Sequence, residues 1–182
     1  ASYNDGKVAW YANDGSGGFG PQLVIATTNG ATGVHTEDLD GDGDIDVLST
    51  SAYPFDNRVA WYANDGTNSF GPQQVISTLA DGARALYAVD LDGDGDSDVL
   101  SASEIDNEIA WYPNIGFGSF GPQQIITTSA NTVQAVHAFD LDGDGDSDVV
   151  SASYSDDKIS WYANNGLGNF GPQQIISTSA NG

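Results

Sequence analysis

The pattern Asp-Leu-Asp-Gly-Asp-Gly-Asp-x-Asp occurs three times in this chain of 182 residues, and it limits the possible folds more than any other feature of the sequence. The copies begin at Asp38, Asp90 and Asp140. Carboxylates at alternate positions of a short loop supply the oxygen ligands that Ca²⁺ prefers, and the central glycine permits a sharp turn. A solvated acidic turn is the plain alternative, but carboxylates this close together repel one another without a cation. The pattern therefore predicts three calcium-binding loops.

The expected ligands follow the order of EF-hand loops, with side chains at positions 1, 3, 5 and 9 and the backbone carbonyl at position 7. An EF-hand also needs Glu at position 12 and a helix on each side. Position 12 is Ser49, Ser101 or Ser151 here, and the flanking residues have the character of strands. Each loop is therefore predicted to join two strands of a hairpin. The predicted metal-ligating residues are Asp38, Asp40, Asp42, Asp44, Asp46, Asp90, Asp92, Asp94, Asp96, Asp98, Asp140, Asp142, Asp144, Asp146 and Asp148.

The loops belong to an internal repeat. Trp10, Trp61, Trp111 and Trp161 are spaced by 51, 50 and 50 residues, and a Phe follows each Trp by nine. Each repeat contains short runs with strand character, separated by turns rich in Gly, Asn and Asp, and no run has helical periodicity. We therefore predict an all-β, β-propeller-like array of four-stranded antiparallel blades, with about 50 residues per blade and a calcium loop between the first and second strand of each blade.

The repeat boundaries divide a single repeat domain over residues 1–182 into four parts. Residues 1–30 form a partial blade that lacks its first strand and calcium loop, and complete blades are predicted at 31–80, 81–130 and 131–182. Four full repeats would need 19 further residues, equivalent to Val133 through Ser151. An open strand edge invites strand addition. We therefore expect self-association, or pairing with neighbouring repeat copies, by strand complementation.

Phe-Gly pairs recur with the acidic loops, at Phe70-Gly71, Phe120-Gly121 and Phe170-Gly171. Together with Asp-x-Asp-Gly-Asp-Gly-x-x-Asp, they resemble the FG-GAP and VCBS repeats, best known from the integrin alpha-chain propeller. The resemblance covers essentially the whole chain, although Ser-Ala-Ser replaces the Gly-Ala-Pro part of the motif. It implies that each loop bridges the first and second strands of a blade and binds calcium at its surface. Propellers of this family typically have seven blades, so the resemblance implies a longer array or several chains that complete one another.

Composition excludes some partners. The chain has 4 Lys plus Arg against 26 Asp plus Glu, a formal charge of -22, and a nucleic-acid partner would need a basic patch. The few cations form no polybasic membrane patch, and no run approaches the ~20 apolar residues of a membrane helix, so no membrane insertion is expected. Without Cys, disulfides cannot hold the fold, and calcium is the expected substitute. Weak loop sites fill at millimolar calcium, which predicts a secreted protein, extracellular or at the cell surface.

Residues for catalysis are scarce. His35 and His137 occupy the same repeat position, which favours a structural role, and no nucleophile or phosphate-binding motif is present. A glycosidase-like carboxylate pair is the enzymatic alternative, but every acidic cluster is a repeat element. We therefore predict no enzymatic activity, no catalytic residues and no cofactor other than Ca²⁺ at three sites.

The repeated Trp-Tyr pairs have two interpretations. Core packing between blades is the default, because such rings bury large apolar areas. The alternative is a repeated sugar-binding platform, for which Trp61 and Trp111 are the residues to test. Ser and Thr cluster after each fourth strand, either as strand-forming residues that lead into a turn or as O-glycosylation sites.

The predicted function is a non-enzymatic, extracellular calcium-binding structural or adhesive repeat module, which assembles with other chains or tandem copies into a filament or surface layer. The alternative is a carbohydrate-binding lectin or adhesin, with glycans as partners.

Overall fold

A computed structural model of the chain describes residues 1–52 and 56–180. Residues 53–55 and 181–182, which belong to the predicted ranges 31–80 and 131–182, lie outside the described residues. The described residues form β-strands, turns and loops, and none of them is helical. Consequently, this part of the chain offers no helix long and apolar enough to cross a membrane.

The strands form four antiparallel sheets, one after another along the chain. The first sheet contains β1 (Lys7–Asn13) and β2 (Phe19–Thr27). The second contains β3 (Ala31–Glu37), β4 (Asp46–Ser51), β5 (Arg58–Tyr62) and β6 (Gln74–Ser77). The third contains β7 (Ala83–Val89), β8 (Asp98–Ser103), β9 (Glu108–Tyr112) and β10 (Gln124–Thr127). The fourth contains β11 (Val133–Phe139), β12 (Asp148–Ser153), β13 (Lys158–Tyr162) and β14 (Gln174–Ser177).

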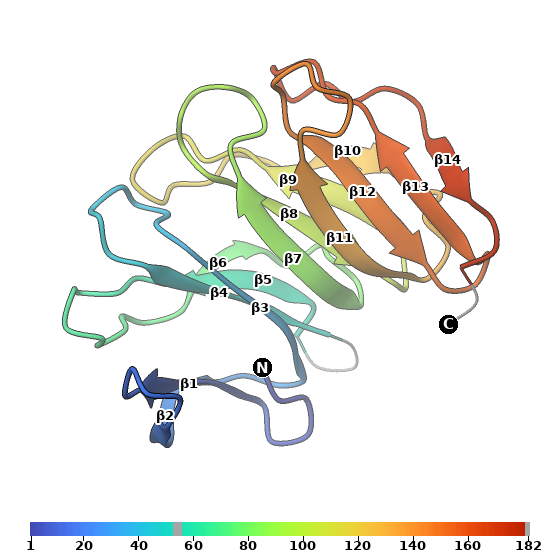
Figure 1. Ribbon diagram of the computed structural model, residues 1–182. Helices are drawn as coiled ribbons and strands as arrows, with labels where there is room; N and C mark the ends of the chain where they lie inside the picture. The colour runs from blue at the N-terminus through green and yellow to red at the C-terminus, as the bar shows by residue number, and fades with distance from the viewer. Residues whose placement is uncertain (53–55, 181–182) are drawn as a thin grey trace.

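The sheets are arranged as an open array of repeats, with the β1–β2 pair at one end and the β11–β14 sheet at the other (Figure 1). The first strands of the complete sheets, β3, β7 and β11, lie side by side. The ring centroids of His35 and Tyr87 are 4.7 Å apart, and those of Tyr87 and His137 are 4.2 Å apart. The two histidines therefore belong to an aromatic row along the first strands. The predicted all-β array of antiparallel repeats is confirmed, and among the described residues the array does not close into a ring.

The first sheet is incomplete in the way that the repeat spacing predicts. Its strands β1 and β2 correspond to the third and fourth strands of the other sheets, and β1 pairs with β2 alone among the strands of this structure. In the second sheet, for example, the other edge of the third strand, β5, pairs with the second strand, β4. The corresponding edge of β1 has no such partner among the described strands. The four sheets lie within the ranges 1–30, 31–80, 81–130 and 131–182.

The second strands of the sheets are the most deeply buried. Every residue of β4 and of β8 is buried, including small polar residues such as Ser49 and Ser101. A strand that is covered on both faces reads as a nearly continuous run of small or apolar residues, because no side chain faces water. This burial explains the sequences Asp-Val-Leu-Ser-Thr-Ser and Asp-Val-Leu-Ser-Ala-Ser.

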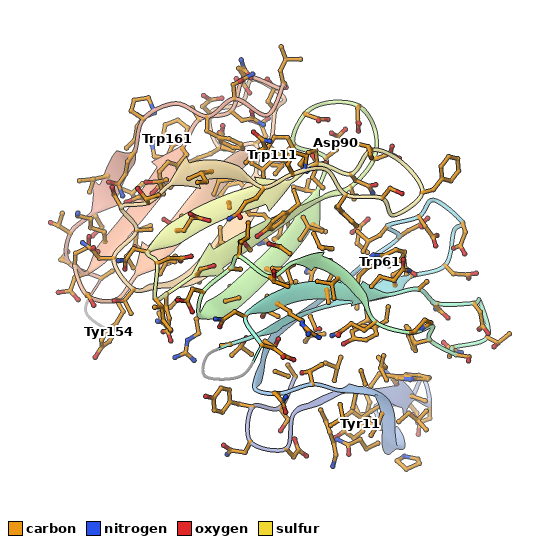
Figure 2. All side chains as sticks on the ribbon, turned by 180° about the vertical axis from the view of Figure 1, so that it is seen from behind. Tyr11, Trp61, Asp90, Trp111, Tyr154 and Trp161 are labelled. Atoms are coloured by element: carbon orange, nitrogen blue, oxygen red, sulfur yellow. The ribbon has the colours of Figure 1, made fainter. Side chains whose placement is uncertain are left out.

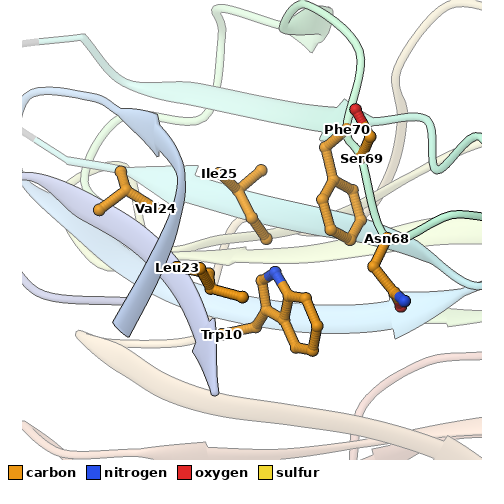
Figure 3. A pocket seen from close by; sticks show the side chains of 7 residues that line it. All are labelled: Trp10, Leu23, Val24, Ile25, Asn68, Ser69 and Phe70. Atoms are coloured by element: carbon orange, nitrogen blue, oxygen red, sulfur yellow. The ribbon is translucent and has the colours of Figure 1, made fainter. Parts of the chain in front are cut away.

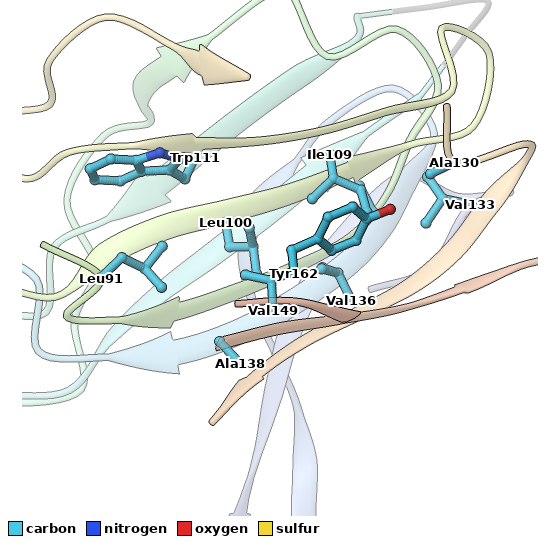
Figure 4. Close-up of a cluster of buried hydrophobic side chains, with 11 residues drawn as sticks. Leu91, Leu100, Ile109, Trp111, Ala130, Val133, Val136, Ala138, Val149 and Tyr162 are labelled. Atoms are coloured by element: carbon cyan, nitrogen blue, oxygen red, sulfur yellow. The ribbon is translucent and has the colours of Figure 1, made fainter. Parts of the chain in front are cut away.

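The core lies between consecutive sheets rather than inside one sheet. In the cluster of Figure 4, Leu100, Ile109 and Trp111 of the third sheet pack with Val149 and Tyr162 of the fourth. Equivalent clusters join the second sheet to the third and the first to the second. Each sheet is therefore stabilised mainly by its neighbours, as in other repeat proteins.

The central Trp-Tyr pairs belong to this core. Trp61 and Trp111 are 3% and 6% exposed, and Tyr62, Tyr112 and Tyr162 are 1% exposed. The predicted core packing is therefore confirmed at these positions. A sugar could not stack on Trp61 or Trp111 without unfolding the interface, so the alternative of a repeated platform is wrong for these two residues.

A glycine makes the close contact between sheets possible. A Cβ atom built on Gly118 would lie 2.4 Å from the Trp61 ring, and one built on Gly168 would lie 2.3 Å from the Trp111 ring. The φ angles of these glycines are +66° and +68°, in the left-handed region. Each buried Trp ring therefore lies directly under a glycine of the following repeat.

Candidate metal centre

Each acidic loop connects the first and second strands of a complete sheet. The loops follow β3, β7 and β11. In each sheet the acidic loop lies at the same end of the strands as the connection between the third and fourth strands. In the second loop, Gly93 and Gly95 have φ angles of +80° and +95°, which other residues rarely adopt. The glycines therefore allow the loop to curl back so that alternate side chains converge.

The first aspartate of each loop organises the backbone. In the second loop, the two carboxylate oxygens of Asp90 accept hydrogen bonds from the backbone N–H groups of Gly93 at 2.7 Å and Gly95 at 3.0 Å. Asp38 and Asp140 accept the equivalent pairs of bonds in their own loops. These bonds fix the loop shape with protein groups alone.

Three carboxylates converge in each loop. Oxygen atoms of the members of a cluster lie within 4.8 Å of one another. The clusters are Asp38, Asp40 and Asp42 in the first loop, Asp90, Asp92 and Asp94 in the second, and Asp140, Asp142 and Asp148 in the third. Loss of solvation and then repulsion from neighbouring carboxylates raise the pKa values of Asp40, Asp92 and Asp142. A bound cation would relieve that repulsion.

The donor set fits a hard cation. Each cluster offers carboxylate oxygens only, which are ligands for Ca²⁺ or Mg²⁺ rather than for metals that prefer nitrogen or sulfur. The described residues therefore have the chemistry that calcium needs at all three loops.

The carboxylates at position 7 of the loops lie outside the three clusters. A Cβ atom built on Gly66 would lie 2.5 Å from an oxygen of Asp44, and one built on Gly166 would lie 2.5 Å from an oxygen of Asp146. These side chains therefore point toward the loop between third and fourth strands, and they are absent from the clusters. This placement is compatible with the expectation that position 7 contributes its carbonyl.

The aspartate at position 9 holds two loops together. Asp98 is fully buried, and its carboxylate accepts hydrogen bonds from the N–H groups of Leu91 at 2.9 Å and Asn114 at 2.7 Å. Burial is the main cause that raises the pKa of Asp98 to about 7. Asp46 and Asp148 make the equivalent pairs of bonds. Of these three carboxylates, only that of Asp148 also belongs to a metal-type cluster among the described residues.

The leucine at position 2 of the loop is a functional residue that the sequence interpretation missed. Leu39 and Leu91 are buried in the clusters between consecutive sheets. The carbonyl of Leu39 accepts a hydrogen bond of 2.8 Å from the side-chain amide of Asn114, and the carbonyl of Leu91 accepts one of 2.7 Å from Asn164. The acidic loop is therefore also part of the contact between repeats. The signal in the sequence was an Asn three residues after each Trp.

A hollow lies at the N-terminal end of the array, where no acidic loop is present. The cavity has a volume of about 340 Å³ and lies beside Trp10, Leu23, Val24, Ile25, Asn68, Ser69 and Phe70 (Figure 3). In the next repeat the equivalent Trp61 ring contacts Gly118 and lies near Asp40 of its own loop. Trp10 lacks such a loop and remains partly exposed.

Comparison with known proteins gives a family and a fold. The model of the FG-GAP-like repeat matches residues 1–49, 38–101, 90–151 and 140–182. A search of curated protein sequences finds no match.

The solved structures that are similar to this chain include a lectin and a biofilm matrix protein. An Agrocybe aegerita lectin that recognises non-reducing terminal N-acetylglucosamine matches with a TM-score of 0.66 and 21% identity, over 97% of this chain and 48% of the lectin chain. The V. cholerae biofilm matrix protein Bap1 matches with a TM-score of 0.39 and 17% identity, over 88% of this chain and 28% of that protein. This chain thus spans about half the length of the lectin, with which it shares the fold.

The family match covers the whole chain, and it includes every acidic loop and every Trp-Tyr pair. The chain therefore belongs to the FG-GAP-like repeat family.

Proposed function

We propose that this chain is a non-enzymatic structural or adhesive repeat module that binds calcium at its three acidic loops. The observation that carries the proposal is the convergence of three carboxylates in each loop, with oxygens within 4.8 Å of one another. Such clusters are costly without a cation, and the charge of -22 adds to that cost.

The residues of the second loop illustrate the proposed site. Asp90, Asp92 and Asp94 would supply carboxylate oxygens, and the Gly93 and Gly95 N–H groups already hold Asp90 in place. Calcium supplies the positive charge that lets these carboxylates remain ionised side by side. Because Leu91 lies in the same loop, a rigid loop also holds the contact between repeats.

The test of this proposal is calcium binding linked to stability. Calorimetric titration of the chelated protein should show calcium binding, and the melting temperature should rise with calcium because ligand binding to the native state adds to stability. The control is a variant in which one carboxylate of each cluster is removed, by changing Asp40, Asp92 and Asp142 to Asn together. A melting temperature that does not respond to chelation would refute the proposal.

We place the module outside the cell and in assembly with other copies or with tandem repeats. Weak loop sites fill at extracellular calcium concentrations, and the packing of each sheet on its neighbours supports assembly with further repeats. The proposed role is mechanical or adhesive because the acidic clusters are repeat elements and the histidines pack in an aromatic row.

A second candidate function is carbohydrate binding. One solved structure with the same fold is a lectin that recognises terminal N-acetylglucosamine, and the hollow beside Trp10 combines aromatic rings with the polar side chains of Asn68 and Ser69. An aromatic ring beside polar side chains suits a ligand such as a sugar, which has an apolar face and hydroxyl groups. The proposed sugar contact is therefore Trp10 rather than Trp61 or Trp111.

A glycan array tests this second candidate. Binding should be lost in Trp10→Ala and retained in Trp161→Ala, a matched control that changes a partly exposed Trp at the other end of the array. Absence of binding by the wild-type chain on an array that includes N-acetylglucosamine would exclude the candidate.

A further inference from the structure

The loop between the third and fourth strands of a sheet has a recurring pair at its turn, an Asp or Asn followed by Gly. The pair is Asp14-Gly15 in the first repeat, Asp65-Gly66 in the second and Asn165-Gly166 in the fourth. In the third repeat Ile115 takes the place of the Asp or Asn. The fourth loop therefore holds an amide where the first two hold a carboxylate.

The turns of the first two loops stabilise an anion. The Asp14 carboxylate accepts hydrogen bonds from the backbone N–H groups of Ser16 at 2.8 Å and Gly18 at 2.9 Å. Asp65 accepts the equivalent pair of bonds in its own loop. These bonds, first among them the one from Ser16, hold the pKa of Asp14 below its usual value. We call the two N–H groups, two and four residues after the acidic residue, the cradle.

Asn165 lies in the same cradle. Its side-chain oxygen accepts hydrogen bonds from the N–H groups of Leu167 at 3.1 Å and Asn169 at 3.3 Å. Its side-chain NH₂ group donates no hydrogen bond to the residues that the structure describes. Because Asn165 is exposed, water reaches the amide. The carbonyl group is therefore polarised, while the NH₂ group is free to leave.

The backbone nitrogen that follows Asn165 is also free. In the other three loops the glycine N–H donates to the side-chain oxygen of an asparagine, as Gly15 does to Asn13 at 2.9 Å. In the fourth loop the equivalent oxygen, on Asn164, accepts instead from the N–H of Asn165 at 2.8 Å. Within the described part of the chain, the N–H of Gly166 has no hydrogen-bond acceptor. Glycine also has no side chain to hinder its nitrogen.

We propose that Asn165 is a site of spontaneous deamidation, and that the folded loop directs the product to normal aspartate. The Gly166 nitrogen attacks the side-chain carbonyl carbon of Asn165 and gives its proton to water. The negative charge of the tetrahedral intermediate develops on the oxygen in the cradle, and preorganised N–H donors stabilise such an oxyanion. The bond from this carbon to the amide nitrogen then breaks, which releases ammonia and leaves a cyclic succinimide.

Water completes the reaction. Opening of the succinimide at the former side-chain carbonyl gives aspartate, whereas opening at the main-chain carbonyl gives isoaspartate. The cradle donors point at the former side-chain oxygen, so they activate that carbonyl and favour aspartate. The sum of the steps converts an amide and a water molecule into a carboxylate and an ammonium ion, and it needs no other reactant.

The identity of the product matters because this loop packs on the preceding repeat. The Gly168 N–H donates to the Leu91 carbonyl at 3.1 Å, and Gly168 lies on the Trp111 ring. Figure 2 labels Trp111 and also Asp90, at which the acidic loop of that repeat begins. Aspartate leaves the backbone unchanged, whereas isoaspartate adds a methylene group to the backbone and would displace this contact. The cradle therefore allows a new charge without loss of the contact between repeats.

Incubation of the full chain at neutral pH, followed by peptide mass spectrometry, measures the reaction. Asn29-Gly30 is the matched internal control, because Asn29 is exposed but no N–H group of the described residues donates to its side chain. Cleavage after Phe170 separates Asn165 from the Asn-Gly pair at 181–182, which lies outside the described residues. Asn165 should deamidate about tenfold faster than Asn29. An equal or lower rate at Asn165 would overturn the proposal.

Unfolding in urea separates the effect of the fold from that of the local sequence. Without the cradle, the rates at Asn165 and Asn29 should become similar. The share of isoaspartate at Asn165, detected with an isoaspartyl methyltransferase, should be higher in urea than in the folded chain. The same share in both states would overturn the direction of the product by the loop.

Two variants complete the test. Asn165→Gln should abolish the mass change at this position, because a longer side chain closes a larger ring more slowly. Asn165→Asp supplies the product directly and should keep the melting temperature of the fresh protein, since the first two loops already hold a carboxylate. A marked fall in that temperature would contradict the fit of aspartate to the cradle. None of these measurements requires calcium, so the deamidation and the proposed calcium role can fail independently.

Discussion

The second and third acidic loops have the same sequence, Asp-Leu-Asp-Gly-Asp-Gly-Asp-Ser-Asp, but different surroundings. In the second loop, Leu91 is 1% exposed, and its carbonyl accepts hydrogen bonds from Asn164 and Gly168 of the next repeat. In the third loop, Leu141 is 39% exposed, and residues 1–52 and 56–180 contain no following repeat that covers it. The sequence of the nonapeptide alone therefore does not determine whether its leucine is buried.

The difference shows that the loop has two separable tasks. In both copies the first aspartate holds the glycine N–H groups and so fixes the loop backbone, and in both copies it belongs to a cluster of three carboxylates. The contact with the next repeat exists only where that repeat is present. Changes to the cluster should therefore affect both loops, whereas changes to the leucine should affect the covered loop far more.

The largest expected effect is that of calcium removal. A ligand at a thousand times its Kd stabilises the native state by about 4 kcal/mol, so chelation should lower the melting temperature by roughly 10 °C or more. Scanning calorimetry with and without a chelator measures this change. Asp90→Asn and Asp140→Asn should remove similar shares of the calcium-dependent stability, because the first aspartate makes the same backbone bonds in both loops, and a much larger loss for Asp90→Asn would mean that the cluster and the contact are coupled.

Truncation of the leucine is the direct test of the comparison. Leu91→Ala leaves a cavity between the third and fourth sheets and should lower the free energy of unfolding by about 2 to 5 kcal/mol. Leu141→Ala removes a partly exposed side chain and should lower it by less than about 1 kcal/mol. Urea denaturation in calcium, at a protein concentration that keeps the chain monomeric, measures both values. Similar losses would contradict the distinction between covered and uncovered loops.

The asparagine that reaches the covered loop should have a smaller effect. Asn164→Ala removes the donor to the Leu91 carbonyl at 2.7 Å and to the Ser147 carbonyl at 3.1 Å, and it should cost about 1 to 3 kcal/mol. The matched variant Asn64→Ala removes a bond to Ile45 within its own repeat, and Asn64 is less buried. It should cost about 1 kcal/mol or less. A larger loss for Asn64→Ala would show that this contact between repeats contributes little.

The pH dependence of the chelated protein is the smallest expected effect. The folded-state pKa of Asp98 is raised to about 7 from the ordinary 3.8, so between these values the folded state binds a proton that the unfolded state releases. Stability from this group therefore increases as the pH falls from 7 toward 4 and is lost as the pH rises through 7. Between pH 7 and pH 6 the gain should be roughly 1 kcal/mol, and Asp98→Asn should reduce it. An unchanged pH profile in that variant would assign the dependence to other carboxylates.

Much of the architecture could be predicted from particular residues. The spacing of Trp10, Trp61, Trp111 and Trp161 set the repeat length, and the acidic loops marked the turn between first and second strands. These predictions succeeded because a repeat encodes the same local structure each time. The incomplete first sheet could also be found, by counting residues between equivalent positions.

The roles of other residues could not be predicted, because they depend on contacts between repeats. The sequence predicted Asp98 as a metal ligand, whereas in the structure its carboxylate accepts hydrogen bonds from two backbone N–H groups and joins two loops. The Trp-Tyr pairs had two interpretations until the structure showed Trp61 and Trp111 beneath glycines of the following repeat.

The sequence by itself determined the repeat, the order of the strands and the positions of the acidic loops, because these follow from local patterns of turn, strand and charge. Only the tertiary structure decided which loop leucines are buried and which aromatic rings are exposed. The physical reason is that burial depends on the neighbouring repeat, and identical nonapeptides therefore differ when one of them has a neighbour and the other has none.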